Sequence, residues 1–188
     1  MHVEASIIAR CKKYEKAAFF ELFKTYERYL YKLCFSYVQN EQDALDLTQE
    51  VYIKVFKNIS AYDDKMPFHP WFRAVAVNTC INFKRIRRLD SVSLNDSEED
   101  SKALEEVVAA KNDVESEVLD RELGHMIREN LEYLKSKHRM VLVLRYYEGL
   151  SYEEIAALLK EPLGTVKTNI HRARSLLKEK LEAALSKS

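Results

Sequence analysis

The sequence predicts an all-α protein of two small helical domains joined by a flexible acidic linker. Apolar residues recur at the spacing of helices over nearly the whole chain, and strand-like alternation is rare. Three glycines and three prolines are all that 188 residues contain. Basic residues gather at 84–88 and 160–180, on either side of an acid-rich segment, although the formal net charge is zero. The expected domains are residues 1–88 and 116–188, with the linker at 89–115.

The first domain opens with an aromatic-rich apolar stripe that is best explained as core. Its members are Phe19, Leu22, Phe23, Tyr26, Leu30, Leu33, Cys34 and Tyr37. The next helix is expected to begin after Asn40, since asparagine caps helix N-termini well. Residues 62–69 then form a loop, and Pro70 suits the first turn of a helix that continues to about Arg88.

The outward side of the helix after Asn40 carries an acidic patch. Residues three, four and seven apart share a helix face, and this face holds Asp43, Asp46, Gln49 and Glu50. Such a patch is either a partner surface or a solvated face, because acids are favoured near a helix N-terminus. The pattern alone leaves both interpretations open.

An amide-and-arginine stripe marks the helix after Pro70. Asn78, Asn82 and Arg85 fall on one polar face, and Arg87 and Arg88 follow. Amides can reach base edges and cations can hold phosphates, so the stripe suits single-stranded or partly opened nucleic acid. The alternative is an ordinary basic helix end, which the helix dipole favours.

The second domain is expected to contain a helix-turn-helix of winged-helix-like size. Ser136 is expected to cap one helix and Gly149 to end it. Ser151 and Glu154 then form a capping box, and residues 162–164 turn the chain. The second helix of the motif buries Val166, Ile170, Ala173, Leu177, Leu181 and Leu185.

The polar side of that second helix has the character of a DNA-reading surface. Lys167, Thr168, His171 and Arg172 lie near its start and point away from the apolar stripe. A helix held in this way fits the major groove of DNA. The alternative is a solvated face on an ordinary helical hairpin.

Secretion, membrane insertion and metal binding are not expected. The N-terminus has no apolar run of the secretory type, and no stretch is long and apolar enough to span a bilayer. Cys11, Cys34 and Cys80 are odd in number and lack zinc-site spacing, and the last two lie among apolar neighbours. We therefore expect a cytoplasmic protein that has no cofactor and no metal.

Four stretches of the chain, in order, carry a family likeness. Residues 43–52, 70–79, 134–149 and 151–174 resemble the conserved regions of bacterial sigma factors of the extracytoplasmic-function group, in the sigma-70 superfamily. The resemblance covers nearly the whole chain except the linker. It implies the same two-domain layout that charge and periodicity predict.

The resemblance also implies roles for the polar surfaces. The face with Asp43, Asp46, Gln49 and Glu50 resembles the one that docks on the clamp helices of the largest catalytic subunit of RNA polymerase. The loop at 63–69 and the helix after it resemble the element that captures a flipped base of the −10 promoter motif. The implied −10 contacts are Phe68, Asn78, Asn82, Lys84, Arg85, Arg87 and Arg88. The implied −35 contacts are Thr165, Lys167, Thr168, His171, Arg172 and Arg174.

Two residues depart from the family pattern. Lys160 stands where the family often has glycine, and a left-handed lysine is costly, so a slightly different turn is expected there. Asn169 replaces a frequent arginine, which should weaken phosphate contacts or alter promoter preference.

The expected function is that of a non-enzymatic subunit which directs RNA polymerase to specific promoters. Its expected partners are core RNA polymerase (clamp helices and flap), promoter DNA and an anti-sigma factor. The first rival is a stand-alone helix-turn-helix regulator, for which the sequence shows no clear dimerisation helix. The second is a metal-dependent hydrolase using His69, His125, His138 and His171, which lie on different elements without coordinating spacing.

Overall fold

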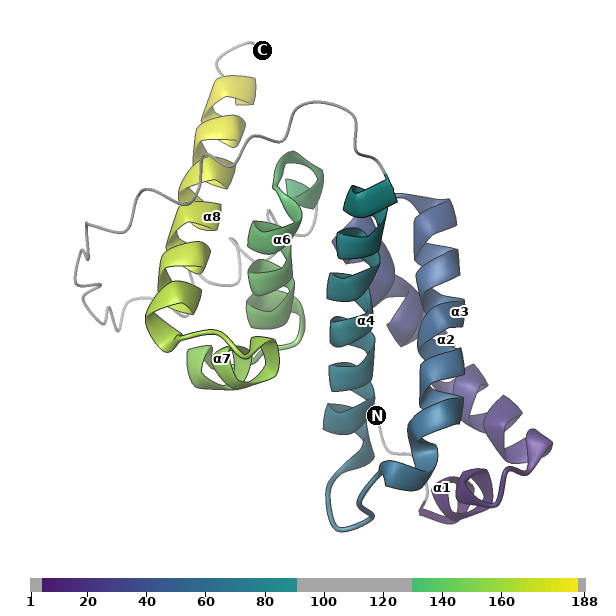
Figure 1. Cartoon of the computed structure of the whole chain (residues 1–188). Coiled ribbons are helices and arrows are strands. Elements are labelled where there is room, and N and C mark those ends of the chain that lie inside the picture. The colour runs from purple at the N-terminus through teal and green to yellow at the C-terminus, as the bar shows by residue number, and fades with distance from the viewer. Residues whose placement is uncertain (1–4, 91–129, 186–188) are drawn as a thin grey trace.

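The computed structural model describes residues 5–90 and 130–185. Every regular element in these ranges is helical, and Figure 1 shows the helices as two groups that lie side by side. The predicted fold class is therefore confirmed. Most of the expected acidic linker, and the start of the expected second domain, lie outside the described residues, so the domain boundaries stay a prediction.

The first group contains four long helices and one short turn. They are α1 (Ala5–Lys12), α2 (Lys16–Val38), α3 (Glu41–Asn58), the 3-10 turn η1 (Ile59–Ala61) and α4 (Phe68–Asp90). The aromatic-rich stripe falls on α2 alone, and most of its members are buried against α3 and α4. As predicted, the Asn40 side chain caps α3 by accepting a hydrogen bond from the Asp43 N–H at 3.0 Å.

Aromatic rings fill the centre of this group. Tyr26 from α2 and Phe72 from α4 are both completely buried, and their ring centroids lie 4.2 Å apart. Phe68 and Tyr62 extend the cluster toward the loop before α4, with their rings meeting edge to face at 5.2 Å. Helix α4 begins two residues before Pro70, which stands in the first turn where its missing N–H costs nothing.

The second group is smaller and contains the helix-turn-helix. Its elements are η2 (Leu131–Tyr133), α6 (Ser136–Leu142), the π-helix η3 (Val143–Tyr147), α7 (Tyr152–Leu159) and α8 (Leu163–Leu185). The prediction that Ser136 caps α6 is wrong: the extended Lys135 holds the capping position without a side-chain bond, and Ser136 is already helical. Gly149 follows the π-helix with φ +68°, which glycine adopts without strain.

The turn of the helix-turn-helix is well defined. The predicted capping box is present: the Glu154 N–H donates to Ser151 Oγ at 3.1 Å, and the Ser151 N–H donates to the Glu154 carboxylate at 2.8 Å. Helix α8 begins directly after Pro162, so the turn is shorter than expected. The apolar stripe of α8 is buried at Val166, Ile170, Ala173 and Leu177, and the side chains of Leu181 and Leu185 lie outside the described residues.

Lys160 ends α7 in the left-handed conformation, with φ +56°. The turn therefore has the backbone conformation that glycine would give it, and this conformation is strained for a lysine. We expect Lys160→Gly to raise the stability of this domain by about 0.5–1 kcal/mol, because glycine adopts this conformation freely. Thermal unfolding followed by circular dichroism would measure the gain. Lys160→Ala, which keeps the strained φ, is the matched control, and an equal gain from it would contradict the explanation.

Candidate functional site

The exposed face of α8 gathers most of the residues predicted to read the −35 element. Thr165, Lys167, Thr168 and His171 are all exposed, on the side opposite the buried stripe. The Thr168 hydroxyl donates to the Gly164 carbonyl at 2.9 Å, so its oxygen still offers an acceptor to a ligand. The first turns of α8 thus present hydroxyl, imidazole and ammonium groups on one surface, which is the chemistry that contacts base edges and phosphates.

The two arginines of this set are placed differently. Arg172 and Arg174 are both half-buried, and the Arg174 guanidinium lies 5.2 Å from the ring centroid of Tyr146 in η3. Arg174 therefore helps to hold α8 against the π-helix η3. A similar contact, Arg145 over the Tyr152 ring at 5.2 Å, fixes the start of α7.

Helix α4 presents the predicted amide stripe to solvent. Asn78 and Asn82 are exposed one turn apart, on the side away from the buried Ala76 and Cys80. The helical backbone continues through Asp90, which places the last predicted −10 residues on the final turns of α4. The side chains of Lys84, Arg85, Arg87 and Arg88 lie outside the described residues.

Phe68 is not an open contact surface. Its side chain is 8% exposed and packs edge to face on Tyr62 and beside Trp71, with ring centroids 5.2 and 5.4 Å away. Phe68 can therefore affect the binding of a ligand only by fixing the conformation of the loop that it anchors. The sequence could not reveal this, because an aromatic residue at a loop end looks the same whether buried or open.

The loop before α4 is held by local bonds and by α1. The Tyr62 hydroxyl donates to the Met66 carbonyl, and Asp63 accepts from the Lys65 N–H at 3.0 Å. Lys12 from α1 forms an ion pair with Asp64 at 2.6 Å. A cavity of about 510 Å³ separates α1 from this loop, with Tyr26, Phe68 and His69 among its lining residues. The loop before α4 is thus held at several points and borders an open pocket.

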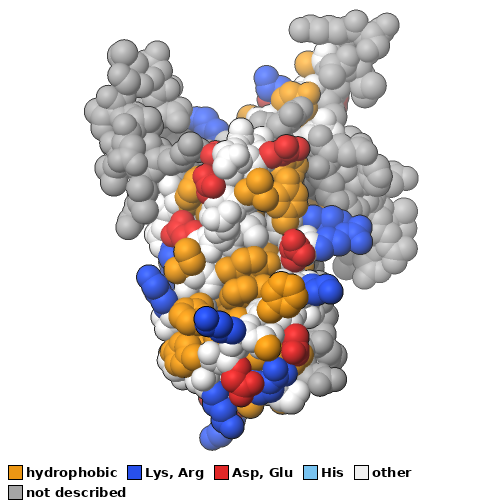
Figure 2. All heavy atoms as spheres, turned by 90° about the vertical axis from the view of Figure 1, so that its right-hand side faces the viewer, with side chains coloured by type: hydrophobic (Ala, Val, Ile, Leu, Met, Phe, Trp, Pro, Cys, Tyr) orange, Lys and Arg blue, Asp and Glu red, His pale blue; other side chains and the backbone are white. Residues whose placement is uncertain are grey.

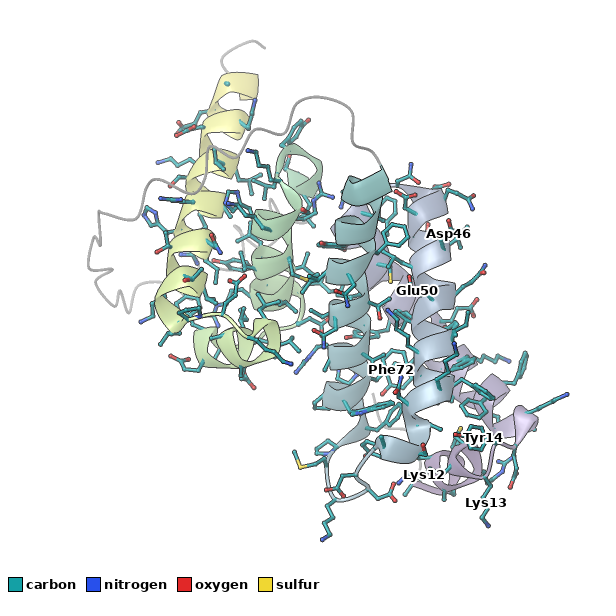
Figure 3. The ribbon with its side chains drawn as sticks, viewed as in Figure 1. Lys12, Lys13, Tyr14, Asp46, Glu50 and Phe72 are labelled. Atoms are coloured by element: carbon teal, nitrogen blue, oxygen red, sulfur yellow. The ribbon has the colours of Figure 1, made fainter. Side chains whose placement is uncertain are left out.

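The predicted acidic face of α3 is present. Asp46 and Gln49 are exposed, whereas Asp43 and Glu50 are half-buried. Asp46 and Glu50 lie about one turn apart on α3 (Figure 3). Glu50 pairs with Lys54 at 2.7 Å, and this exposed pair contributes little to stability.

Sequence reasoning missed the apolar half of this surface. Leu45, Ile53 and Phe56 are 47%, 52% and 43% exposed on the same helix. Figure 2 views this side of the molecule and shows apolar side chains gathered between charged ones. Phe56 continues into an aromatic row, with ring centroids 5.3 Å from Tyr14 and 4.8 Å from Phe19. We call Leu45, Asp46, Gln49, Ile53 and Phe56 the α3 surface. A mixed apolar and acidic surface of this kind suits a protein partner with basic and apolar groups.

A polar cluster joins the two groups of helices. The Tyr29 hydroxyl of α2 donates to the Glu148 carboxylate at 3.0 Å. Arg73 and His69 of α4 approach the same carboxylate oxygen at 3.6 and 4.0 Å. Burial raises the pKa of the Glu148 carboxyl, and the bond from Tyr29 and the charge of Arg73 oppose that rise. Burial and the Arg73 charge lower the pKa of His69. No sequence signal relates these residues, because they are far apart in the chain.

The cysteines are core residues, which the apolar neighbours of Cys34 and Cys80 had predicted for those two. Cys11, Cys34 and Cys80 are free and completely buried, and burial raises the pKa of the Cys11 thiol to about 11. Among the described residues, no group of three or more His, Cys, Asp or Glu side chains is arranged to hold a metal ion. His125, named in the hydrolase alternative, lies outside the described residues. In the same part of the chain, no helix has the length and apolarity needed to cross a bilayer.

Comparison with known proteins identifies both halves of the chain. Residues 22–90 match the family model of sigma-70 region 2, and residues 125–177 match that of sigma-70 region 4. The first match contains α3, the loop before α4 and all of α4, and the second contains α7 and the first two thirds of α8.

Curated relatives cover almost the full length. The ECF RNA polymerase sigma factor SigW of Bacillus subtilis (strain 168) is 34% identical over 178 residues, which are 93% of this chain and 94% of that protein. The ECF RNA polymerase sigma-E factor of Escherichia coli (strain K12) is 32% identical over 182 residues, 94% of this chain and 93% of the relative. The RNA polymerase sigma-H factor of Pseudomonas aeruginosa (strain PAO1) is 30% identical over 185 residues, 97% and 95% of the two chains.

Solved structures share the fold at lower identity. CnrH, solved in complex with the cytosolic domain of CnrY, aligns with a TM-score of 0.58 at 22% identity, over 94% of this chain and 96% of that one. The sigma factor RpoE of Bartonella quintana, solved with the anti-sigma factor NepR, aligns with a TM-score of 0.59 at 20% identity, over 87% and 96%. Two matched regions and full-length relatives above 30% identity show that the chain belongs to the extracytoplasmic-function (ECF) family of RNA polymerase sigma factors.

Proposed function

We propose that this protein is a promoter-specificity subunit that binds core RNA polymerase, reads promoter DNA through two separate domains and assists transcription initiation. The observation that carries the proposal is the pairing of two polar helix faces, on α4 and α8, within the two regions that match sigma-70 regions 2 and 4. The protein contributes recognition and no catalytic step of its own, and it acts in the cytoplasm, where polymerase and DNA are.

The first domain is proposed to act at two surfaces. The α3 surface docks on polymerase, with apolar contacts at Ile53 and Phe56 and charge complementarity at Asp46. The amide stripe of α4, together with the shaped loop before it, receives an unpaired base of the −10 element. The basic residues at the end of α4 hold the neighbouring phosphates.

The second domain is proposed to bind the −35 duplex in the major groove. Thr165, Lys167, Thr168 and His171 supply the exposed contacts at the start of α8. Arg174 holds the helix orientation through its stacking on Tyr146. The partners also include an anti-sigma factor, because a similar fold has been solved with one.

In-vitro transcription tests the proposal directly. Purified protein added to core polymerase should produce discrete start sites on genomic templates, and core polymerase alone should not. A gel-shift assay distinguishes this function from that of a stand-alone helix-turn-helix regulator. Tight binding of promoter duplex without polymerase would favour the regulator.

Asn78→Ala should impair promoter opening far more than initial duplex binding. The exposed amide offers both a donor and an acceptor to a Watson–Crick edge, and losing such a pair costs about 1–3 kcal/mol. We therefore expect open-complex formation, measured by permanganate reactivity of unpaired thymines, to fall by about 10- to 100-fold. Closed-complex affinity should change less than about twofold. Asn58→Ala, an exposed asparagine at the end of α3, is the matched control, and equal losses in both assays would contradict base capture.

A further inference from the structure

Lys12, the last residue of α1, ties that helix to the loop before α4, residues 62–67. Its ammonium forms an ion pair with the Asp64 carboxylate at 2.6 Å and lies 5.4 Å from the centroid of the Tyr62 ring. Figure 3 shows Lys12 extending toward this loop, whereas Lys13 points away from it. One cation therefore holds two residues of the loop, the carboxylate by charge and the ring by its π face.

Packing alone does not fix the loop against α1. The open pocket of about 510 Å³ lies between them, with Ile8 and Ala9 of α1 and Met66 and Pro67 of the loop among its lining residues. Residues 63–67 are all exposed, so few buried apolar contacts hold this part of the loop. An exposed ion pair adds little to the stability of the whole domain. Where packing is sparse, however, such a pair has a large share in setting where the loop lies.

Aromatic rings connect this tie to the amide stripe of α4. Tyr62 is 6% exposed, and its hydroxyl donates to the Met66 carbonyl, so the ring moves with the loop. Its ring centroid lies 5.4 Å from that of Trp71, which is the only tryptophan of the chain. Trp71 and Asn78 are seven residues apart on α4, so they share a helix face and lie about 10 Å apart along it. A displaced loop therefore changes the surface next to Asn78.

We propose that Lys12 is a positioning residue for −10 recognition, because it holds the loop before α4 in the conformation that admits a base to the Asn78 face. The proposal rests on the proposed function of α4, but the position of the loop is measurable without polymerase or DNA. A direct contact of Lys12 with a promoter phosphate would be a different role. Phosphate contacts carry no sequence information, so such a contact would act alike on every −10 sequence.

The fluorescence of Trp71 tests the tie in the free, full-length protein. Lys12→Glu places a carboxylate against that of Asp64, so the loop should move off the indole and quenching by neutral acrylamide should rise by about twofold. Adding Asp64→Lys restores an opposite-charge pair and should return the quenching toward the wild-type value. Lys13→Glu, the same charge change at the neighbouring exposed residue, should leave quenching unchanged.

Base discrimination during promoter opening tests the consequence. Open complexes with core polymerase are measured by permanganate reactivity on a promoter and on derivatives with one −10 base changed. The preference for the original base should fall by about three- to tenfold in Lys12→Glu, in keeping with the loss of an ion pair and a cation–π contact. The exchange with Asp64→Lys should recover it, and Lys13→Glu should keep it. Circular dichroism would show that every variant is folded, and a purely structural role of Lys12 would lower the thermal midpoint without changing the preference.

Three results would overturn the proposal. Equal quenching in Lys12→Glu and Lys13→Glu would show that Lys12 does not hold the loop. A displaced loop with unchanged base preference would show that its position does not serve recognition. An equal loss of opening on all the promoters would assign Lys12 to phosphate binding instead. Failure of the wild-type protein to produce discrete start sites with core polymerase would refute the proposed function, and the quenching comparison would still decide whether Lys12 holds the loop.

Discussion

Phe72→Ala is expected to lower the free energy of unfolding of the first domain by about 3–5 kcal/mol, the usual cost of emptying a buried phenylalanine site. Phe72 is completely buried, and its ring meets those of Tyr26 and Phe68 at 4.2 and 5.9 Å. It joins α4 to α2, so its loss removes a contact that orients α4. Because domains of this size have about 5–15 kcal/mol in total, the variant should lose a large share of its stability and unfold at a markedly lower temperature.

Phe20→Ala is the matched control for this prediction. Phe20 lies on α2 but is 72% exposed, so the same chemical change should alter stability by less than about 0.5 kcal/mol. Thermal and urea unfolding, followed at 222 nm, would compare the two variants. Similar losses from both would mean that the aromatic cluster around Phe72 is not the centre of the domain.

The sequence could predict whatever depends on neighbours within a turn or two. The Asn40 cap, the Ser151–Glu154 capping box and the left-handed Gly149 all follow from local hydrogen bonding and backbone freedom, and all were confirmed. The buried stripe of α8 follows from its 3.6-residue period. The position of Ser136 could not be predicted as reliably, because the extended conformation of Lys135 depends on how η2 joins α6.

Asp46→Lys is expected to weaken binding to core polymerase by about 10- to 100-fold at moderate salt. A reversed charge at the centre of a partner surface replaces attraction by repulsion, and truncations at such positions cost about 1–3 kcal/mol. Asp46 is exposed, and its carboxylate accepts a hydrogen bond from the Gln42 side chain at 3.3 Å, so the fold should be unaffected by the change. Fluorescence anisotropy of labelled protein titrated with core polymerase would measure the change.

Glu179→Lys is the control. Glu179 is an exposed acid on α8, in the other group of helices and away from the α3 surface. The same charge change there should alter polymerase affinity by less than about twofold. The wild-type affinity should also fall more steeply with salt than that of Asp46→Lys. Parallel salt dependences, or equal losses at both positions, would contradict docking through the α3 surface.

The candidate surfaces were only partly predictable, for a physical reason. Polar residues at helical spacing reveal an exposed face, so Asp46, Gln49, Asn78 and Lys167 were found from the pattern. Exposed apolar residues such as Ile53 and Phe56 give no such signal, because an apolar side chain usually indicates core. The Tyr29–Glu148 contact spans most of the chain, and no local rule relates its partners.

The π-helix at Val143–Tyr147 affects the direction in which α8 faces. In an ideal α-helix, Arg139 and Glu148 would point in opposite directions, since nine residues make two and a half turns. The wider i→i+5 turns of a π-helix rotate the chain less per residue around the helix axis. Both side chains can therefore contact α2. Deleting one residue from this segment would turn α7 and α8 by about 100° relative to α6, within the second group of helices. A single peptide unit therefore sets the direction in which α8 faces.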